Sequence, residues 1–319
     1  MKAKHVIIYL LLVIVTSSCI RDEAPNAEAD ILSCRLPGIT MTTSPIINNN
    51  SVTLFVTPGT NISALAPEFT LTSGATITPA SGTERNFNSP QEYQVTAADG
   101  IWKKTYAISV IDTELATIYN FEDTISGKKY YIFVERENDK VIMEWASGNA
   151  GYAMTGVAKT ADDYPTFQIA NGKNGKCLSL VTRSTGFFGG LVGMPIAAGN
   201  LFIGSFDVNN AMSNPLQATK FGLPFRHVPT YLAGYYKYKA GDQFTEGGKP
   251  VEGKRDICDI YAIMYETSVS VPTLDGTNAF TSPNLVSMAR IKDAKETDEW
   301  TTLNSRSQPF RENSSTRRN

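Results

Sequence analysis

Histidine and cysteine are scarce in this chain. Of 319 residues only two are histidines, His5 and His227, and four are cysteines. No HExxH, CxxC or G-x-S-x-G motif occurs, and "NGKNGKC" lacks the Ser or Thr that follows the lysine of a Walker A loop. These absences exclude zincin, thioredoxin, α/β-hydrolase and P-loop chemistry, and we expect neither a metal nor another cofactor.

Excess positive charge is also lacking. The chain has 29 Lys and Arg against 31 Asp and Glu, and loss of a leader with Lys2 and Lys4 would leave a net charge of −4. Nucleic-acid binding needs a basic face, so we expect no nucleic-acid partner. Three cysteines remain beyond Cys19, and an exported chain could pair Cys177 with Cys258 or keep all three thiols free.

The N-terminus has the anatomy of an export signal. Lys2 and Lys4 precede ten apolar residues (6–15), which at ~1.5 Å per residue span only about half of a bilayer core. Small residues then lead into Cys19. We expect residues 1–18 to be a lipoprotein signal peptide, Cys19 to be acylated and 19–30 to be a flexible tether, which places the protein on the outer membrane facing outwards. A plain signal peptide is the alternative.

The alternation of apolar and polar residues predicts an all-β fold in two domains. Over 31–112, "SVTLFVT" (51–57), paired short runs in 68–83, and two runs around Asp99-Gly100 in 92–111 predict an immunoglobulin-like sandwich. Over 113–305, further short runs with Gly, Pro and Asn between them predict a larger jelly-roll-type β-sandwich. These runs are 128–135, 140–146, 175–183, 199–208, 231–241, 256–267 and 284–292. The polar end, 306–319, predicts a disordered or truncated tail.

Two sets of sequence blocks resemble known families. "PEFTLTSGATITPASGT" and "YQVTAADGIWKKTYAISV" resemble the immunoglobulin-like N-terminal modules of surface lipoproteins. "IYNFED", "EWASGNAG", "IAAGNLFIGSFD", "ATKFGLPF", "GYYKYKAGDQF" and "DICDIYAIMYE" resemble the putative carbohydrate metabolism domain family. The resemblance implies a cell-surface protein that handles a polysaccharide or oligosaccharide. It assigns no catalytic residue.

Carboxylates and aromatic rings are the side chains that sugar-handling proteins use, and the run 256–267 concentrates them. Period two places Asp259, Tyr261 and Tyr265 on one face of a strand and Asp256 on the other. With Tyr235 from the run 231–241 they predict a tyrosine-lined groove, although tyrosines also favour ordinary strands.

The run 140–146 supplies a second candidate. Glu144 alternates with Trp145, so the carboxylate is expected to point into solvent or a cleft while the indole faces the core. Trp145 is also a candidate for binding the sugar. Asn149, in the turn that follows, could bind a sugar hydroxyl. Three functions remain open: glycan binding without catalysis, glycoside hydrolysis by Asp259 with Glu144 or Asp256, and a structural adhesin or pilus-like role.

Overall fold

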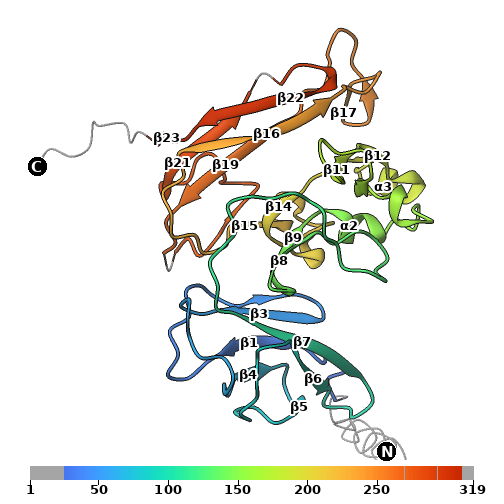
Figure 1. Cartoon of the computed structure of the whole chain (residues 1–319). Helices are drawn as coiled ribbons and strands as arrows, with labels where there is room; N and C mark the ends of the chain where they lie inside the picture. Colours follow the sequence, from blue (N-terminus) through green and yellow to red (C-terminus); the bar gives the residue numbers. More distant parts are fainter. Residues whose placement is uncertain (1–24, 269, 293, 311–319) are drawn as a thin grey trace, which may run out of the picture.

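The computed structural model describes residues 25–268, 270–292 and 294–310, and these form two β-domains (Figure 1). The expected signal peptide and Cys19 lie outside this range. Within it, no helix combines the length and apolar character needed to cross a bilayer. The predicted all-β fold class is confirmed: an immunoglobulin-like sandwich precedes a larger β-sandwich.

The first domain packs a two-stranded sheet against a five-stranded one. In the small sheet β1 (Ile31–Arg35) pairs with β4 (Glu68–Leu71). The large sheet has the order β2 (Ile46–Ile47), β3 (Ser51–Phe55), β7 (Lys103–Ile111), β6 (Gln91–Thr96) and β5 (Thr76–Thr78). All its neighbours are antiparallel except β3 and β7, which are parallel.

The predicted hairpin at 92–111 forms because its turn and its alternation agree. Asp99 Oδ1 accepts hydrogen bonds from the backbone N–H groups of Ile101 at 2.8 Å and Trp102 at 3.1 Å, and Gly100 adopts a positive φ of 70°. Alternate residues of both strands then enter the core, where Tyr93 and Tyr106 lie opposite each other, each 1% exposed.

The end of the predicted tether belongs to the first domain instead. Asp30 Oδ1 accepts hydrogen bonds from Lys104 Nζ at 2.5 Å and Tyr106 Oη at 2.9 Å, and Thr72 Oγ1 donates to the backbone oxygen of Glu28. Ala29 is buried. The prediction of a flexible 19–30 is therefore wrong for 28–30, because a long-range contact fixes them.

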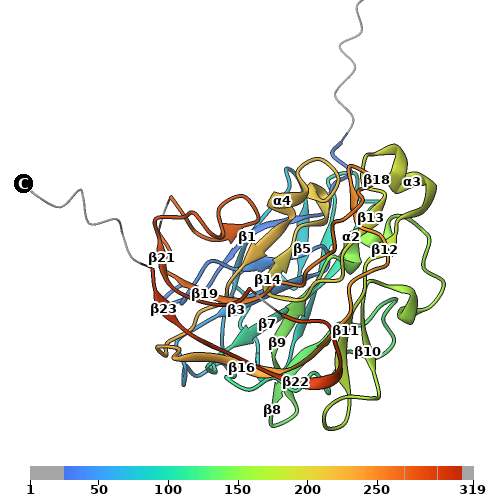
Figure 2. The ribbon, with the colours of Figure 1, turned by 90° about the horizontal axis from the view of Figure 1, so that it is seen from above.

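The second domain contains two main layers. The first has the order β20 (Leu274–Asp275), β15 (Thr219–Phe221), β14 (Phe202–Phe206), β9 (Lys140–Ala146) and β8 (Val134–Glu137). The second comprises the pair β16 (Tyr231–Tyr238) and β22 (Thr297–Arg306), and the three strands β19 (Ile260–Tyr265), β21 (Leu285–Ile291) and β23 (Gln308–Pro309). Seen from above, the second layer overlies β9 and β14 (Figure 2).

Short elements border these layers. Three further strand pairs are β10 (Thr166–Ile169) with β11 (Cys177–Leu180), β12 (Arg183–Ser184) with β13 (Ile196–Ala197), and β17 (Thr245–Glu246) with β18 (Lys249–Pro250). The helices are α2 (Asn149–Ala153), η1 (Ala161–Asp163), α3 (Gly186–Leu191), η2 (Val208–Asn210) and α4 (Pro215–Ala218).

The C-terminal segment contains strands that the sequence pattern did not predict. β22 extends to Arg306, β23 pairs with Ser287 and Met288, and the N–H of Phe310 donates to the backbone oxygen of Val286 at 2.8 Å. The prediction of a disordered or truncated tail is thus wrong for 306–310. Residues 311–319 lie outside the described range.

The three cysteines of the described chain are free, so the Cys177–Cys258 disulfide is not formed. Cys34 is buried in the core of the first domain, and burial raises the pKa of its thiol to about 12. A thiol held neutral in this way contributes apolar packing and no nucleophile.

The two opposed core tyrosines allow a matched test. Tyr106 Oη bonds to Asp30 and accepts from the N–H of Ile31, whereas Tyr93 Oη has no hydrogen-bond partner among the described residues. We expect Tyr106→Phe to destabilise the first domain by about 1–2 kcal/mol and Tyr93→Phe to be neutral or stabilising. Hydrogen exchange of the β6 and β7 amides measures the stability change in each variant. Equal losses of stability in the two variants would contradict the different hydrogen bonding assigned to the two tyrosines.

Candidate functional site

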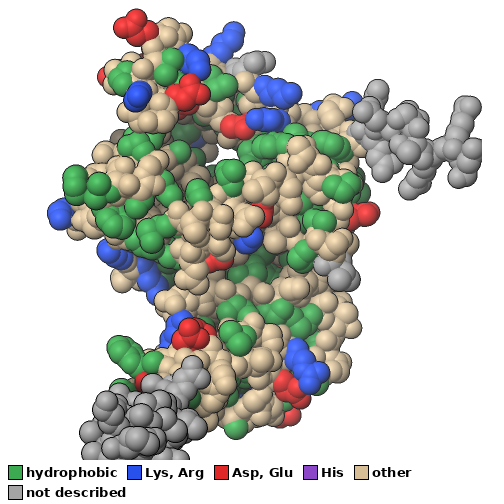
Figure 3. Space-filling model, turned by 180° about the vertical axis from the view of Figure 1, so that it is seen from behind, with side chains coloured by type: hydrophobic (Ala, Val, Ile, Leu, Met, Phe, Trp, Pro, Cys, Tyr) green, Lys and Arg blue, Asp and Glu red, His purple; other side chains and the backbone are tan. Residues whose placement is uncertain are grey.

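A large hollow borders the two layers of the second domain. Its volume is about 4030 Å³, and it is lined by both layers and by residues of the first domain such as Ile46 and Tyr106. Hydrophobic side chains reach the surface around it on the face shown in Figure 3. The layers meet at one end, where the hydroxyl of Tyr265 on β19 donates to the backbone oxygen of Phe221 on β15, and Thr273 Oγ1 donates to the same oxygen at 2.8 Å.

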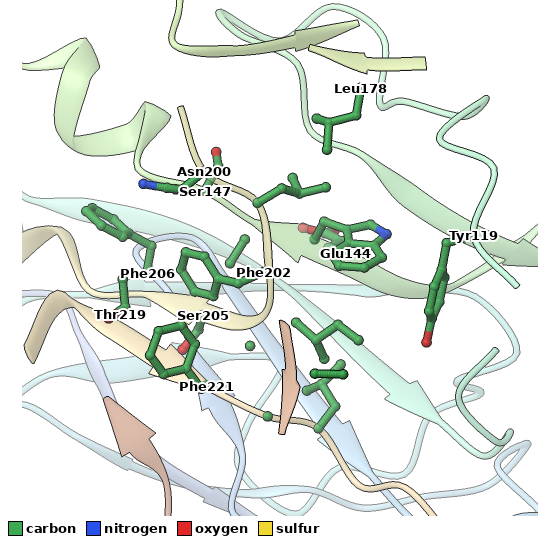
Figure 4. A pocket seen from close by; sticks show the side chains of 18 of the residues that line it. Tyr119, Glu144, Ser147, Leu178, Asn200, Phe202, Ser205, Phe206, Thr219 and Phe221 are labelled. Atoms are coloured by element: carbon green, nitrogen blue, oxygen red, sulfur yellow. The ribbon is translucent and has the colours of Figure 1, made fainter. Parts of the chain in front are cut away.

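Three phenylalanines and one carboxylate share the wall formed by the five-stranded layer. Gly204 lies opposite Phe221, and Phe202 and Phe206 are each two residues from Gly204, so their rings share a face. Phe202 also lies opposite Ala146, which places Glu144 on that face. Figure 4 shows these four side chains around the pocket. Glu144 is exposed on this wall, and its catalytic role stays a prediction.

The environment of Glu144 opposes its ionisation. Desolvation by the surrounding protein raises the pKa of the carboxyl, and the charge of Lys128 only partly offsets this effect. Burial, together with the negative charge of Glu144, in turn raises the pKa of Tyr130. A carboxyl with a raised pKa in a cavity is a candidate for proton transfer.

The two other predicted acids lie on the opposite wall, and one of them is already paired. Asp259 accepts two hydrogen bonds from Arg290, from Nε at 2.8 Å and from Nη2 at 2.7 Å. The guanidinium stacks at 4.5 Å over the ring of Phe280. Asp256 Oδ1 accepts a hydrogen bond from the N–H of Ile257. The bidentate ion pair leaves Asp259 poorly suited to act as a nucleophile or base.

The predicted tyrosines also line the hollow, but they do not form one open groove. The ring of Tyr261 packs at 4.9 Å against Phe280, and burial together with the charge of Asp259 raises the pKa of its hydroxyl. The hydroxyl of Tyr265 is committed to Phe221. Tyr235 is 54% exposed, and Lys173 Nζ lies 5.1 Å from its ring centroid.

The prediction for Asn149 is wrong. Its side chain is fully buried, its Nδ2 donates to the backbone oxygen of Thr166 at 2.7 Å, and its Oδ1 accepts from the Thr166 N–H at 3.1 Å. The amide therefore ties the start of α2 to β10. Neither of its polar ends is available to a sugar hydroxyl.

Trp145 lies on the other face of β9, in a cluster that the sequence pattern did not reveal. Its Nε1 donates to Glu135 Oε1 at 2.8 Å. The ring of Tyr119 meets the indole edge-on with centroids 5.0 Å apart, and the ring of Phe121 is tilted at 5.5 Å. Aromatic rings beside an acceptor carboxylate provide the two kinds of contact that a sugar needs.

Charge is concentrated in this cluster. Burial raises the pKa of Glu135, and the neighbouring charge of Asp123 adds to the rise, whereas the hydrogen bond from Trp145 lowers it. The pKa of Tyr119 is raised to about 12 by burial and by the charge of Glu135. Tyr119 therefore remains protonated, and two carboxylates lie beside the rings.

The segment 118–123 is held in place by a distant side chain. Gln168 Nε2 donates to the backbone oxygens of Phe121 at 2.7 Å and Glu122 at 2.9 Å, and Phe121 has a positive φ of 57°. Such a backbone is uncommon for a large residue and frequently marks a functional site. The blocks "IYNFED" and "EWASGNAG" contain Tyr119, Asp123 and Trp145. The occurrence of both blocks in one chain was the sequence evidence that could have indicated this cluster.

The part of the chain that the structure describes contains no cluster of side chains suited to binding a metal ion. No group of three or more His, Cys, Asp or Glu side chains gathers there in a geometry that could hold an ion. His227 is engaged with Glu114, with Nε2 and Oε2 2.6 Å apart.

Comparison with known proteins places the chain in a family. Residues 120–314 match the family described as "Putative carbohydrate metabolism domain", and residues 31–110 match "SGBP, N-terminal", where SGBP denotes a surface glycan-binding protein. The chain belongs to the carbohydrate metabolism domain family. No curated protein matches it.

Two solved structures are similar to the chain, and both are described as a putative glycoside hydrolase. The one from Bacteroides thetaiotaomicron is 82% identical with a TM-score of 0.87, covering 91% of this chain and 85% of its own. The one from Bacteroides vulgatus is 46% identical with a TM-score of 0.56, covering 60% of this chain and 78% of its own. These relatives support a carbohydrate-related role.

The raised pKa of Glu144 predicts a pH dependence of stability. Because the folded-state pKa exceeds the unfolded value, stability from this group is fully present below the unfolded pKa and is lost as pH rises through the folded pKa. We expect Glu144→Gln to be more stable than the wild type at pH 8 and to show a smaller difference between pH 4 and pH 8. Urea denaturation at both values measures this. A variant less stable than the wild type at pH 8 would contradict it.

Proposed function

We propose that the second domain binds a glycan at the β8–β9 edge and that the first domain presents it at the cell surface, where Cys19 is lipid-anchored. The observation that carries the proposal is the juxtaposition of the Trp145 and Tyr119 rings with the Glu135 carboxylate. The polar and apolar groups of this cluster complement a pyranose, which offers an apolar C–H face and hydroxyl donors.

Family membership and composition support the same ligand class. Both matching families are carbohydrate-related, and the second is named for surface glycan-binding proteins. The slightly acidic chain disfavours nucleic acid, so a polysaccharide or oligosaccharide is the proposed partner. The binding residues proposed are Trp145, Tyr119 and Glu135.

Glycan binding can be tested by affinity electrophoresis through gels that contain plant or host polysaccharides. We expect at least one polysaccharide to retard the wild type. Loss of a hydrogen bond to a charged group, about 1.5–3 kcal/mol, makes Glu135→Gln bind roughly tenfold or more weakly, and Trp145→Ala should bind more weakly still.

A matched control is available in Trp102, which is 63% exposed on the hairpin of the first domain. Trp102→Ala should retain full retardation. The proposal fails if no polysaccharide retards the wild type, or if Trp102→Ala loses as much binding as Trp145→Ala. Circular dichroism of each variant separates lost binding from lost folding.

A second candidate function, glycoside hydrolysis, is favoured by the raised pKa of Glu144. That residue would act as the general acid, with Asp256 on the opposite wall as its partner, since Asp259 is held by Arg290. The test is release of reducing ends from the polysaccharide that binds best. We expect Glu144→Gln to abolish release while binding persists. Absence of release by the wild type removes this candidate.

A further inference from the structure

One face of the β16–β22 pair is open to solvent. The two strands lie side by side (Figure 1), and residues directly opposite each other share a face. Every second residue of β16 from Tyr231 to Lys237 is exposed, and the β22 residues opposite the first three of them are exposed as well. Trp300 meets Lys237 where the register shifts. The β16–β22 face therefore consists of Tyr231, Ala233, Tyr235, Lys237, Trp300, Thr302, Asn304 and Arg306.

Aromatic rings and ammonium groups lie together on this face. Tyr231 and Tyr235 are 57% and 54% exposed. Lys237 Nζ lies 5.4 Å from the ring centroid of Trp300, and Lys173 Nζ, from the loop between β10 and β11, lies over the ring of Tyr235. An ammonium is attracted to the face of an aromatic ring when it lies within about 6 Å of the centroid. Two of the rings thus have a positive charge beside them.

The positive charge of the β16–β22 face is not neutralised within the protein. Neither of the two lysines forms an ion pair with an Asp or Glu side chain of the described residues. The remaining charged residue of the face is Arg306. Three acids border the face: Glu122, whose Oε1 accepts a hydrogen bond from a backbone N–H at 3.0 Å, and Asp298 and Glu299, which precede Trp300 in β22. The face is cationic, although the chain has a net charge of −2.

The β10–β11 hairpin lies close to this face. Its loop places Lys173 over Tyr235. Burial raises the pKa of the Cys177 thiol in β11 and the charge of Glu122 raises it further, whereas the charge of Lys237 lowers it. Residues of the hairpin and of the face both line the hollow. A ligand on the face therefore meets one ammonium from the hairpin and another from β16.

We propose that the β16–β22 face binds an acidic polysaccharide whose charges are the carboxylates of uronic acid residues. The C–H face of a uronate packs on the exposed tyrosine rings, and its carboxylate, attached directly to the sugar ring, reaches the ammonium groups beside them. Thr302 and Asn304 supply a hydroxyl and an amide for the sugar hydroxyls. Tyr231 and Tyr235 are four residues apart, about 13 Å along a strand, so they contact different sugars of one polysaccharide.

The proposal rests on the proposed function only for the ligand class, a glycan. The two sites select different sugars, because the Trp145 cluster contains two carboxylates that repel a uronate, whereas Lys173 and Lys237 attract it. Nucleic acid also offers anions and rings, but the net negative charge of the chain disfavours it. Charge complementarity therefore favours a uronate polysaccharide.

The experiment measures the affinity of the full chain for oligogalacturonate by isothermal titration calorimetry. The fully methyl-esterified oligosaccharide is the matched ligand, because it has the same backbone without the charges. We expect the acid to bind about tenfold more tightly than the ester at low ionic strength, and the difference to shrink as added salt screens the lysines. A sulfated galactan oligosaccharide without carboxylates and oligothymidylate should both bind more weakly than the acid.

Matched variants locate the binding. Lys173→Gln and Lys237→Gln should each weaken binding of the acid about threefold, as expected for an exposed ion pair, and leave binding of the ester unchanged. Tyr235→Ala should weaken binding of both ligands, because it removes the ring. Lys103→Gln removes an exposed lysine of the first domain and should bind like the wild type. Circular dichroism checks that each variant is folded.

Four results would overturn the proposal: equal affinity for the acid and its ester, tighter binding of the sulfated galactan, tighter binding of oligothymidylate, or an equal loss in Lys103→Gln and Lys237→Gln. The two sites fail separately. Loss of acid binding in Trp145→Ala but in neither lysine variant would remove only the β16–β22 site. Lysine-dependent binding of the acid in a chain that no neutral polysaccharide retards would remove only the site at the β8–β9 edge.

Discussion

The contact between Tyr265 and Phe221 ties the two layers of the second domain together at one end, beside the hollow that both layers line. Gly222 makes this contact feasible. It has a positive φ of 101°, and a Cβ at that position would lie 2.4 Å from the Tyr265 hydroxyl oxygen. Any other residue would strain the backbone and displace the tyrosine. The accessibility of Glu144 and of the phenylalanine wall therefore depends on this junction.

Strand β9 brings two kinds of chemistry to the domain because its side chains alternate. Glu144 faces the hollow, where desolvation favours its neutral form. Trp145, the next residue, faces the opposite way and meets Glu135 and Tyr119. One strand thus carries a carboxyl that favours its neutral form and, at the next residue, the indole of a ring-and-carboxylate cluster.

Local patterns predicted the elements whose residues alternate clearly. The hairpin at 92–111 and the strand at 140–146 follow from period two and, for the hairpin, from Asp99-Gly100. β22 was missed because its Thr, Asp, Asn and Ser residues hide the alternation. Its place is set by β16, which lies earlier in the chain, with Tyr235 opposite Thr302, 67 residues away.

The candidate site was predictable only in part, for the same reason. The direction of Glu144 follows from its own strand. The roles of Asn149, Asp259 and Glu135 follow from Thr166, Arg290 and Trp145, which lie 17, 31 and 10 residues away along the chain. Only the fold reveals such partners. Asn149 is therefore a structural tie, and Asp259 half of an ion pair.

The bond between Asp30 and the core also has a mechanical consequence. Asp30 is held by Lys104 and Tyr106 of β7, and β7 lies between β3 and β6. Tension applied at the N-terminus thus reaches the middle strand of the sheet before it can peel an edge. Pulling would load several backbone hydrogen bonds together in shear, so the domain would resist traction better than an edge-attached one.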